Sequence, residues 1–258
     1  MDSDTVIVFD LDGTLTESKC DIDNVMVDLL RELLKRHRVA IISGASWDQI
    51  VDQVLFDIHI YDETIVRLSV FPTNGAQGYV NQYDPDRGVP KWSQVYSDDI
   101  PKEDRKRIIA AFEASFKELN WQHPDCLYGD IIEDRGTQVT FSAIGQEAPI
   151  RVKCVYDVDG KKRMELVERL REFLPDFEVK LGGTTSIDVN KKGIDKAYGI
   201  QQISKLLRVD EDRMIFIGDS KSLIVNNNPI FKTNVKVYEV YDVEETKQLI
   251  RRILNFEL

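Results

Sequence analysis

The feature that most constrains this fold is an unbroken apolar run near the N-terminus that ends in two carboxylates. Residues 6–9 are Val, Ile, Val and Phe, so neither side of this predicted strand is polar. Such a run is typical of a strand buried on both faces of a parallel sheet, because helices cover both sides of such sheets. Asp10-Leu11-Asp12-Gly13 follows directly, so polar side chains begin where the strand ends.

Apolar strands and amphipathic helices alternate through the first third of the chain. Apolar side chains recur at three- and four-residue spacing over residues 23–36, which predicts a helix with one apolar face. Residues 39–42 form the next predicted strand and residues 47–55 the next helix. This βαβα order predicts an α/β fold with an open, doubly wound parallel sheet, in which sites lie at the carboxyl ends of the strands.

The pattern changes near residue 82, where a loop rich in Asp, Pro and Gly covers residues 83–90. The segments that follow predict an α+β unit with helices over 102–119 and 161–173 and strands over 131–133, 138–141, 177–181 and 186–189. Alternation then resumes, with helices over 195–207 and 243–256 and strands over 214–217 and 235–237. We therefore expect an α/β core, residues 1–82 and 190–258, interrupted by an inserted α+β unit, residues 83–189.

Composition excludes several classes of partner. The net charge of -11 opposes binding to the phosphate backbone of nucleic acids. No apolar run approaches the length that spans a bilayer, and no basic flank precedes the first apolar run as it would in a secretory signal. Three widely spaced cysteines, Cys20, Cys126 and Cys154, suit free thiols in a reducing compartment. We expect a cytoplasmic protein without nucleic-acid or membrane partners.

Asp10 and Asp12 stand two residues apart at the end of the first strand. An extended backbone sends both side chains the same way, so two negative charges converge. Such an arrangement is costly unless a cation or a shared proton joins the two groups. The other interpretation is a polar strand end with an Asp-Gly turn, which is common in proteins.

The run Asp-x-Asp-Gly-Thr at residues 10–14 resembles the first signature of the haloacid dehalogenase superfamily, and further signatures follow in order. Ser43 with Gly44, at the end of the second strand, matches the signature that binds the transferring phosphoryl group. Lys196 matches the lysine that neutralises this group, and Asp219, after Gly218, matches the start of the acidic metal-binding signature. Thr14 completes the set expected to contact phosphate.

More of the chain resembles the phosphomannomutase-like branch, which carries a large α+β cap. Residues 71–76 resemble its segment leading toward the cap, and Ser186 and Asp188 match cap residues that bind sugar hydroxyls. Lys19 and Arg135 match cations that hold the phosphate not being transferred. Two positions depart from the branch. Gln146 occupies a third cationic position, and Asn227 stands where a second metal-site carboxylate is expected.

The resemblance implies a mechanism on a small phosphorylated molecule, a sugar phosphate. Asp10 would attack phosphorus and form an aspartyl-phosphate, while Asp12 would act first as general acid and then as general base. Mg²⁺ would be held by Asp10, Asp219 and the backbone carbonyl of Asp12, with Asn227 beside them. The resemblance also allows a homodimer formed through the cap.

Three activities stay open at this stage. The Gln146 departure weakens the hold on a second phosphate, which favours hydrolysis over a phosphomannomutase reaction, although Arg151 and Lys153 nearby offer compensating charges. Because Asn227 replaces an expected carboxylate, a protein that binds phosphosugars without turnover is a further alternative. Retention of the other signature residues favours an enzyme.

Overall fold

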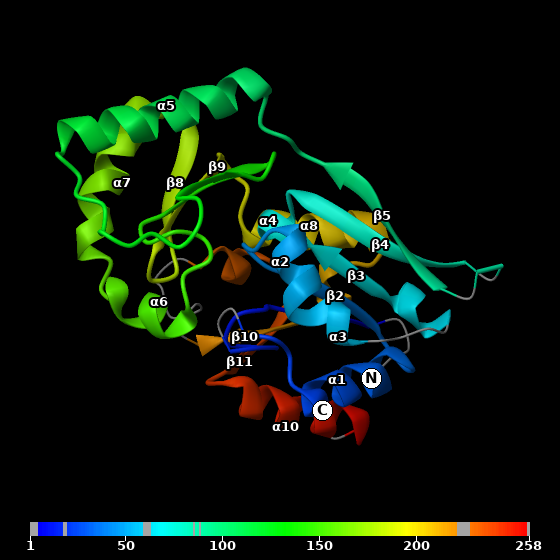
Figure 1. The fold of residues 1–258 in the computed structure, drawn as a ribbon. Helices are drawn as coiled ribbons and strands as arrows, with labels where there is room; N and C mark the ends of the chain where they lie inside the picture. Colours follow the sequence, from blue (N-terminus) through cyan, green and yellow to red (C-terminus); the bar gives the residue numbers. More distant parts are fainter. Residues whose placement is uncertain are drawn as a thin grey trace. The chain divides into compact units, whose positions relative to one another are not determined.

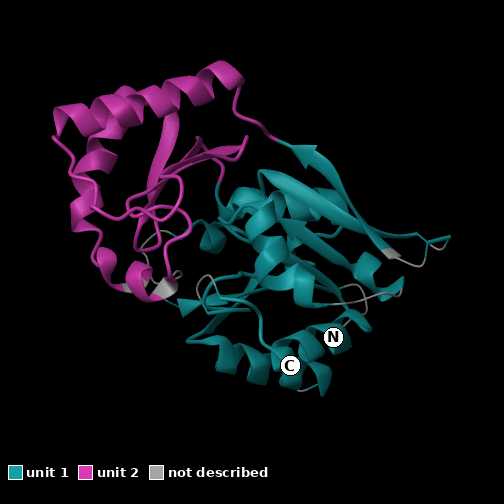
Figure 2. Cartoon of the chain, viewed as in Figure 1, with its two compact units in different colours: residues 1–97, 195–258 teal, residues 98–194 magenta. Residues whose placement is uncertain are grey.

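The structure, a computed structural model, describes residues 5–17, 20–58, 63–84, 86–87, 89–220 and 228–256. The chain forms two compact units (Figure 2), one of residues 1–97 and 195–258 and one of residues 98–194. The second unit begins later than the expected residue 83 because residues 89–97 are a strand that pairs with residues 77–84 of the first unit. It ends at residue 194, where residue 189 was expected. Within the described ranges, no helix is both long and apolar enough to cross a membrane.

A seven-stranded sheet forms the centre of the first unit (Figure 1). Its order is β11 (Lys236–Val240), β10 (Met214–Asp219), β1 (Val6–Phe9), β2 (Arg38–Ile42), β3 (Leu68–Phe71), β4 (Gln77–Asp84) and β5 (Val89–Ser97). The first five strands are parallel, and β4 and β5 add an antiparallel hairpin at one edge. The predicted α/β fold with a parallel sheet is therefore confirmed.

Both faces of this sheet are covered, as in a doubly wound fold. Ile7 and Phe9 of β1 point to one face and pack with apolar residues of α1 (Asn24–Leu34), the stretch 47–58 and α10 (Val243–Leu254). Val6 and Val8 point to the other face and pack with α8 (Lys196–Leu207) and the 3-10 helix η4 (Pro229–Lys232). Period-two alternation along a strand thus explains why every residue of β1 is buried.

Short elements complete the first unit. They are α2 (Trp47–Ile50), the π-helix η1 (Val51–Leu55), α3 (Phe56–Ile58), the 3-10 helices η2 (Glu63–Arg67) and η3 (Glu211–Arg213), and α4 (Pro72–Gly75). The single helix expected over 47–55 is therefore α-helical only in its first turn. The loop expected over 83–90 is the tip of the β4 and β5 hairpin, because these strands meet from Asp84 and Val89 onward.

The second unit is a four-stranded antiparallel sheet with helices on one face. The strand order is β6 (Ile132–Asp134), β7 (Gln138–Ser142), β9 (Ser186–Lys191) and β8 (Phe177–Gly182). Alternate residues, such as Phe141 and Val189, pack against α5 (Lys102–Glu118) and α7 (Lys161–Phe173). The residues between them in β7 and β9 are polar. A helix that was not predicted, α6 (Ile150–Tyr156), precedes α7.

A buried ion pair lies at the start of α7, and its guanidinium also contacts the turn between β8 and β9. Arg163 Nε donates to Asp157 Oδ2 at 2.8 Å, and both side chains are 1% exposed. The same guanidinium donates to the carbonyls of Gly182, Gly183 and Ser186. One side chain therefore holds in place the turn that leads into β9.

Arg163 also lowers the pKa of its partner, Asp157. Burial alone would raise the pKa of Asp157, but hydrogen bonds from Arg163 and from the Lys162 N–H, with the guanidinium charge, hold this pKa below its usual value. A lowered folded-state pKa stabilises the fold above the usual Asp range, which is about 4. The contribution is therefore present at neutral pH and declines only as the pH falls through the lowered pKa.

We predict that Arg163→Met lowers the free energy of unfolding of this unit by about 3–5 kcal/mol, the cost of leaving one buried charge without its partner. The control is Arg169→Met on the same helix, since Arg169 pairs with Glu118 at the surface. Urea unfolding followed by circular dichroism measures both. Equal losses for the two variants would contradict the buried-pair argument.

Candidate active site

Asp10 lies at the carboxyl end of β1, where the backbone and one carboxylate oxygen are both held. Its N–H donates to the Ile217 carbonyl of β10 at 2.9 Å, which continues the ladder between the two strands. Its Oδ1 accepts from the Leu11 N–H at 2.9 Å, and the residue is 5% exposed. The predicted nucleophile is thus a buried carboxylate in a defined orientation.

Lys196 reaches the other carboxylate oxygen from α8. It is the first residue of this helix, after Asp195, whose side chain caps the helix by accepting from the Tyr198 N–H at 3.0 Å. The Lys196 ammonium forms an ion pair with Asp10 Oδ2. The structure therefore brings together two predicted residues that are far apart in sequence, and the positive end of a helix lies beside them, which favours an anion.

Asp219 ends β10 and lies against the loop that follows β1. A Cβ added to Gly13 would lie 3.2 Å from the Asp219 Cβ and 3.3 Å from its carboxyl carbon. Gly13 also has φ +76°, a backbone conformation that residues other than glycine resist. The glycine after Asp12 therefore permits the close approach of the second predicted metal carboxylate.

The loop after β1 is closed by the Leu11 carbonyl, which accepts from the N–H groups of Thr14, Leu15 and Thr16 at 3.2, 2.9 and 3.2 Å. The Thr14 side chain is fully buried, and its hydroxyl makes no hydrogen bond to any group in the described part of the chain. Buried hydroxyls are usually paired, so this one is suited to a ligand or a water. Thr14 was predicted to contact phosphate.

Ser43 occupies the matching position at the end of β2. Its Oγ accepts from the Ala45 N–H at 3.0 Å, and its carbonyl accepts from the Asn74 N–H at 2.7 Å. Thr73 and Asn74 both have positive φ, 48° and 58°. A Cβ on Gly44 would lie 3.7 Å from the Asn74 side-chain nitrogen, so Gly44 and Asn74 are also adjacent.

Thr73 and Asn74 are not predicted as site residues from the sequence, although they lie within the segment 71–76. Non-glycine residues in the left-handed region store strain and often mark functional segments. The available signal is the Asn-Gly dipeptide, because asparagine tolerates this conformation better than most residues.

The donor set fits Mg²⁺ in kind. The described residues contain no group of three or more His, Cys, Asp or Glu side chains that could hold a metal. Mg²⁺, however, is commonly bound by one or two carboxylates and completed by water and substrate oxygens. Asp10 and Asp219, on neighbouring strands, supply two such carboxylates. Because Gly13 has no side chain, Asp219 can lie close to the loop after β1. Asn227 lies outside the described residues.

The second unit carries the predicted sugar-binding residues. Asp188 Oδ1 accepts from the Thr140 hydroxyl at 2.9 Å, and this hydroxyl accepts from Gln138 Nε2 at 2.7 Å. Ser186 is on the same strand as Asp188 and is 7% exposed. A hydrogen-bonded chain of side chains therefore orients Asp188 on the polar face of the sheet.

Two further polar residues on this face were missed from the sequence. Gln138 and Asn190 are directly opposite each other on β7 and β9, and both are buried. Gln138 Oε1 and Asn190 Oδ1 make no hydrogen bond within the described ranges. The signal that could have found them is the period-two recurrence of polar residues along two strands whose other face is apolar.

The predicted cations near the sugar site are already engaged. Arg135 pairs with Glu133 at 2.7 Å, and its side chain is 9% exposed. Lys153 donates to the Gln146 backbone carbonyl at 2.6 Å. Lys19 lies outside the described residues. Two cations that could hold a second phosphate thus have protein partners.

We predict that Gly13→Ala destabilises the protein more than Gly193→Ala. Both glycines have positive φ, +76° and +84°, so each substitution incurs about 1–2 kcal/mol of backbone strain. Only at Gly13 does the added Cβ also press on a neighbour, Asp219, because nothing lies within 4 Å of a Cβ at Gly193. Thermal unfolding of both variants measures the difference. Equal shifts would show that the Asp219 contact adds nothing.

Comparison with known proteins agrees with this geometry. A family model described as haloacid dehalogenase-like hydrolase matches residues 7–222. A probable phosphomannomutase of Caenorhabditis elegans is 25% identical over 265 residues, covering 98% of this chain and 96% of that protein. The phosphomannomutase of Encephalitozoon cuniculi is 27% identical over 227 residues, covering 84% and 80%.

Solved structures of low sequence identity share the fold. The ATP-bound IMP-nucleotidase of Plasmodium falciparum has a TM-score of 0.73 at 17% identity, with coverage of 99% of this chain and 61% of that one. A haloacid dehalogenase-like hydrolase from Bacteroides thetaiotaomicron has a TM-score of 0.63 at 15% identity, covering 97% and 99%. The chain belongs to the haloacid dehalogenase-like hydrolases, is similar to the phosphomannomutase-like branch of that family, and is an enzyme of the phosphoryl-transfer type.

Proposed function

We propose that this enzyme transfers the phosphoryl group of a sugar phosphate to water, through an aspartyl-phosphate on Asp10. The observation that carries the proposal is the ion pair between the buried Asp10 and Lys196 at the carboxyl edge of the sheet, with Asp219 on the neighbouring strand. A held carboxylate beside a cation and a helix N-terminus is suited to attack on a phosphorylated, negatively charged substrate.

In the first half-reaction, a carboxylate oxygen of Asp10 forms a bond to phosphorus while the bond from phosphorus to the sugar oxygen breaks. Asp12 gives its proton to that leaving oxygen. Lys196, Ser43, Gly44 and Thr14 would contact the phosphoryl oxygens, and Lys196 would neutralise part of their charge. Bound Mg²⁺ would supply further charge neutralisation, with Asp10, Asp219 and the Asp12 carbonyl as its ligands.

In the second half-reaction, Asp12 removes a proton from water as the water oxygen attacks phosphorus. The bond between phosphorus and Asp10 breaks, which releases phosphate and restores the carboxylate. The same residue thus acts as acid and then as base, which is expected when one group serves both half-reactions.

We assign substrate specificity to the second unit. Ser186 and Asp188 match sugar-binding residues of the branch, and the chain from Gln138 through Thr140 orients the Asp188 carboxylate. The names of the relatives support a hexose phosphate as substrate. In this proposal residues 98–194 act as the cap and the other unit carries the chemistry.

The contacts of the positively charged side chains in the cap favour hydrolysis over the mutase reaction. A mutase must hold a second phosphate while the sugar reorients. Here Arg135 is paired with Glu133, Lys153 is bound to the Gln146 carbonyl, and residue 146 itself is uncharged. Transfer to a second sugar hydroxyl is the alternative, because the relatives named above are phosphomannomutases.

We predict that Asp10→Asn lowers turnover of para-nitrophenyl phosphate with Mg²⁺ by at least about a hundredfold, because an amide cannot form the phosphorylated intermediate. Thermal unfolding serves as the fold control. A variant that keeps more than about a few per cent of wild-type activity would show that Asp10 is not the nucleophile, because loss of an essential nucleophile usually reduces activity far more than this.

Product analysis with mannose 1-phosphate separates the candidate reactions. We expect free phosphate and mannose in equal amounts. Mannose 6-phosphate without free phosphate would establish the mutase instead. Binding of the sugar phosphate without either product would indicate a protein that binds without turnover.

A further inference from the structure

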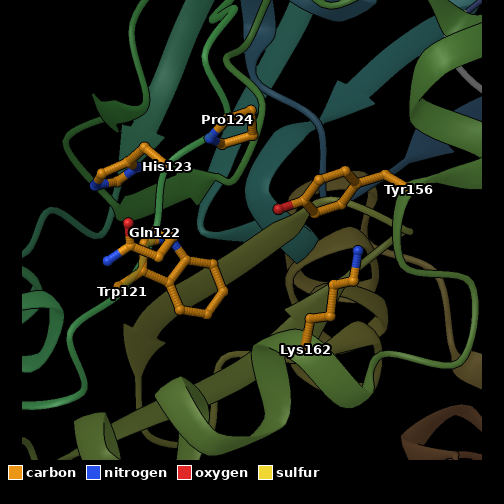
Figure 3. Close-up of a pocket in the computed structure, with 6 residues that line it drawn as sticks. All are labelled: Trp121, Gln122, His123, Pro124, Tyr156 and Lys162. Carbon is orange, nitrogen blue, oxygen red and sulfur yellow. The ribbon is translucent and has the colours of Figure 1, made fainter.

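The second unit contains an open surface pocket of about 430 Å³ that the proposed reaction does not use. It is lined by Trp121, Gln122, His123, Pro124, Tyr156 and Lys162 (Figure 3). None of these residues is among those predicted for phosphoryl transfer or sugar binding. Pockets of roughly 300–1,000 Å³ with aromatic walls and a few polar groups are typical of small-molecule sites.

One side of the pocket is preformed by aromatic packing. The backbone N–H of Trp121 donates to the Phe116 carbonyl at 2.9 Å, and the Trp121 ring meets Phe141 edge to face, with centroids 6.0 Å apart. The His123 ring meets Phe116 in the same manner at 5.0 Å. Phe141 belongs to the hydrophobic core of this unit, and Phe116 packs against that core. A flat apolar wall is therefore held in place before any ligand arrives.

The facing side carries the polar groups. Tyr156 ends α6, and Lys162 is the second residue of α7. The Lys162 ammonium lies 4.9 Å from the centroid of the Tyr156 ring, and Figure 3 shows both side chains across the pocket from Trp121. Burial and the charge of Asp157 raise the pKa of Tyr156, so its phenol keeps its proton at neutral pH and can donate.

Lys162 carries an exposed positive charge beside this pocket. Lys161, Lys162 and Arg163 open α7, although the helix dipole disfavours cations at this end. Lys161 pairs with Asp159 at 2.7 Å and Arg163 with Asp157 at 2.8 Å. Among the ion pairs of the described residues, none joins Lys162 to a carboxylate. One of the three positive charges therefore lies beside the pocket, where an anion would stabilise it.

We propose that this pocket binds a small aromatic carboxylate. The ring packs on the Trp121 face, and the carboxylate takes hydrogen bonds from Lys162 and from the Tyr156 hydroxyl. One ammonium and one phenol suit a singly charged carboxylate, whereas phosphate groups usually gather several cationic donors. The site is separate from the chemistry of Asp10 and does not rest on the proposed reaction.

Calorimetric titration of the full chain tests the proposal, with 2-naphthoate as the probe. We expect Lys162→Gln to weaken binding about fivefold or more, since a charged hydrogen bond at a partly exposed site is lost. The matched control is Lys161→Gln, which removes a neighbouring positive charge that already pairs with Asp159 and should change the dissociation constant less than about twofold. The uncharged analogue 2-naphthamide should bind wild type as weakly as 2-naphthoate binds Lys162→Gln.

Three results would overturn the proposal. They are equal affinity of wild type and Lys162→Gln for 2-naphthoate, equal affinity of wild type for the acid and the amide, and no saturable binding up to about 10 mM, a weak limit for specific recognition. Tyr156→Phe, which removes only the hydroxyl, decides the outcome if Lys162→Gln does not fold. Asp10→Asn should bind 2-naphthoate as wild type does, which separates this site from the phosphoryl-transfer site.

Discussion

The burial of β1 on both faces is the constraint on which the rest of the first unit depends. Its four residues have no exposed surface, and β10 and β2 flank it on both edges. A strand enclosed in this way can present polar groups only where it ends. Asp10 is the first residue past that end, and the neighbouring strands bring Asp219 and Ser43 to the same edge of the sheet. The position of the candidate site therefore follows from the packing of the core.

The sheet of the second unit differs from that of the first unit, because one of its faces is polar and includes buried residues. The apolar face packs against α5 and α7 in the ordinary way. On the other face, hydrogen bonds link Gln138, Thr140 and Asp188, while Arg163 holds the turn before β9 through three carbonyls. Buried polar groups that are fully paired make a rigid surface, and those left unpaired, such as Asn190 Oδ1, are open to a ligand or water. This division suits a surface that selects a polar substrate.

The positively charged side chains of this protein differ in whether they are already paired with a carboxylate. Two cations of the second unit, Arg135 and Arg163, have carboxylate partners, Glu133 and Asp157. Such a cation has less charge left for a second phosphate, whereas Lys196 is paired with Asp10, the very group proposed to bond to phosphorus. The same reasoning separates Lys161 from Lys162 on α7, although the two residues are adjacent and chemically identical.

The sequence by itself determined the elements whose pattern is local. The apolar run of β1 and the amphipathic face of α1 were readable, since strand and helix periods act over a few positions. Asp10, Lys196 and Asp219 were identified through the resemblance of short sequence runs to the signatures of a known family. Only the tertiary structure decided which distant groups meet. The β4 and β5 hairpin was missed because its strands carry many polar residues and it is attached to the sheet by the pairing of β4 with β3. The burial of Arg163 was also invisible, because a charge in the first turn of a helix is usually exposed, and here the nearby Asp157 and three carbonyls from a distant turn enclose it.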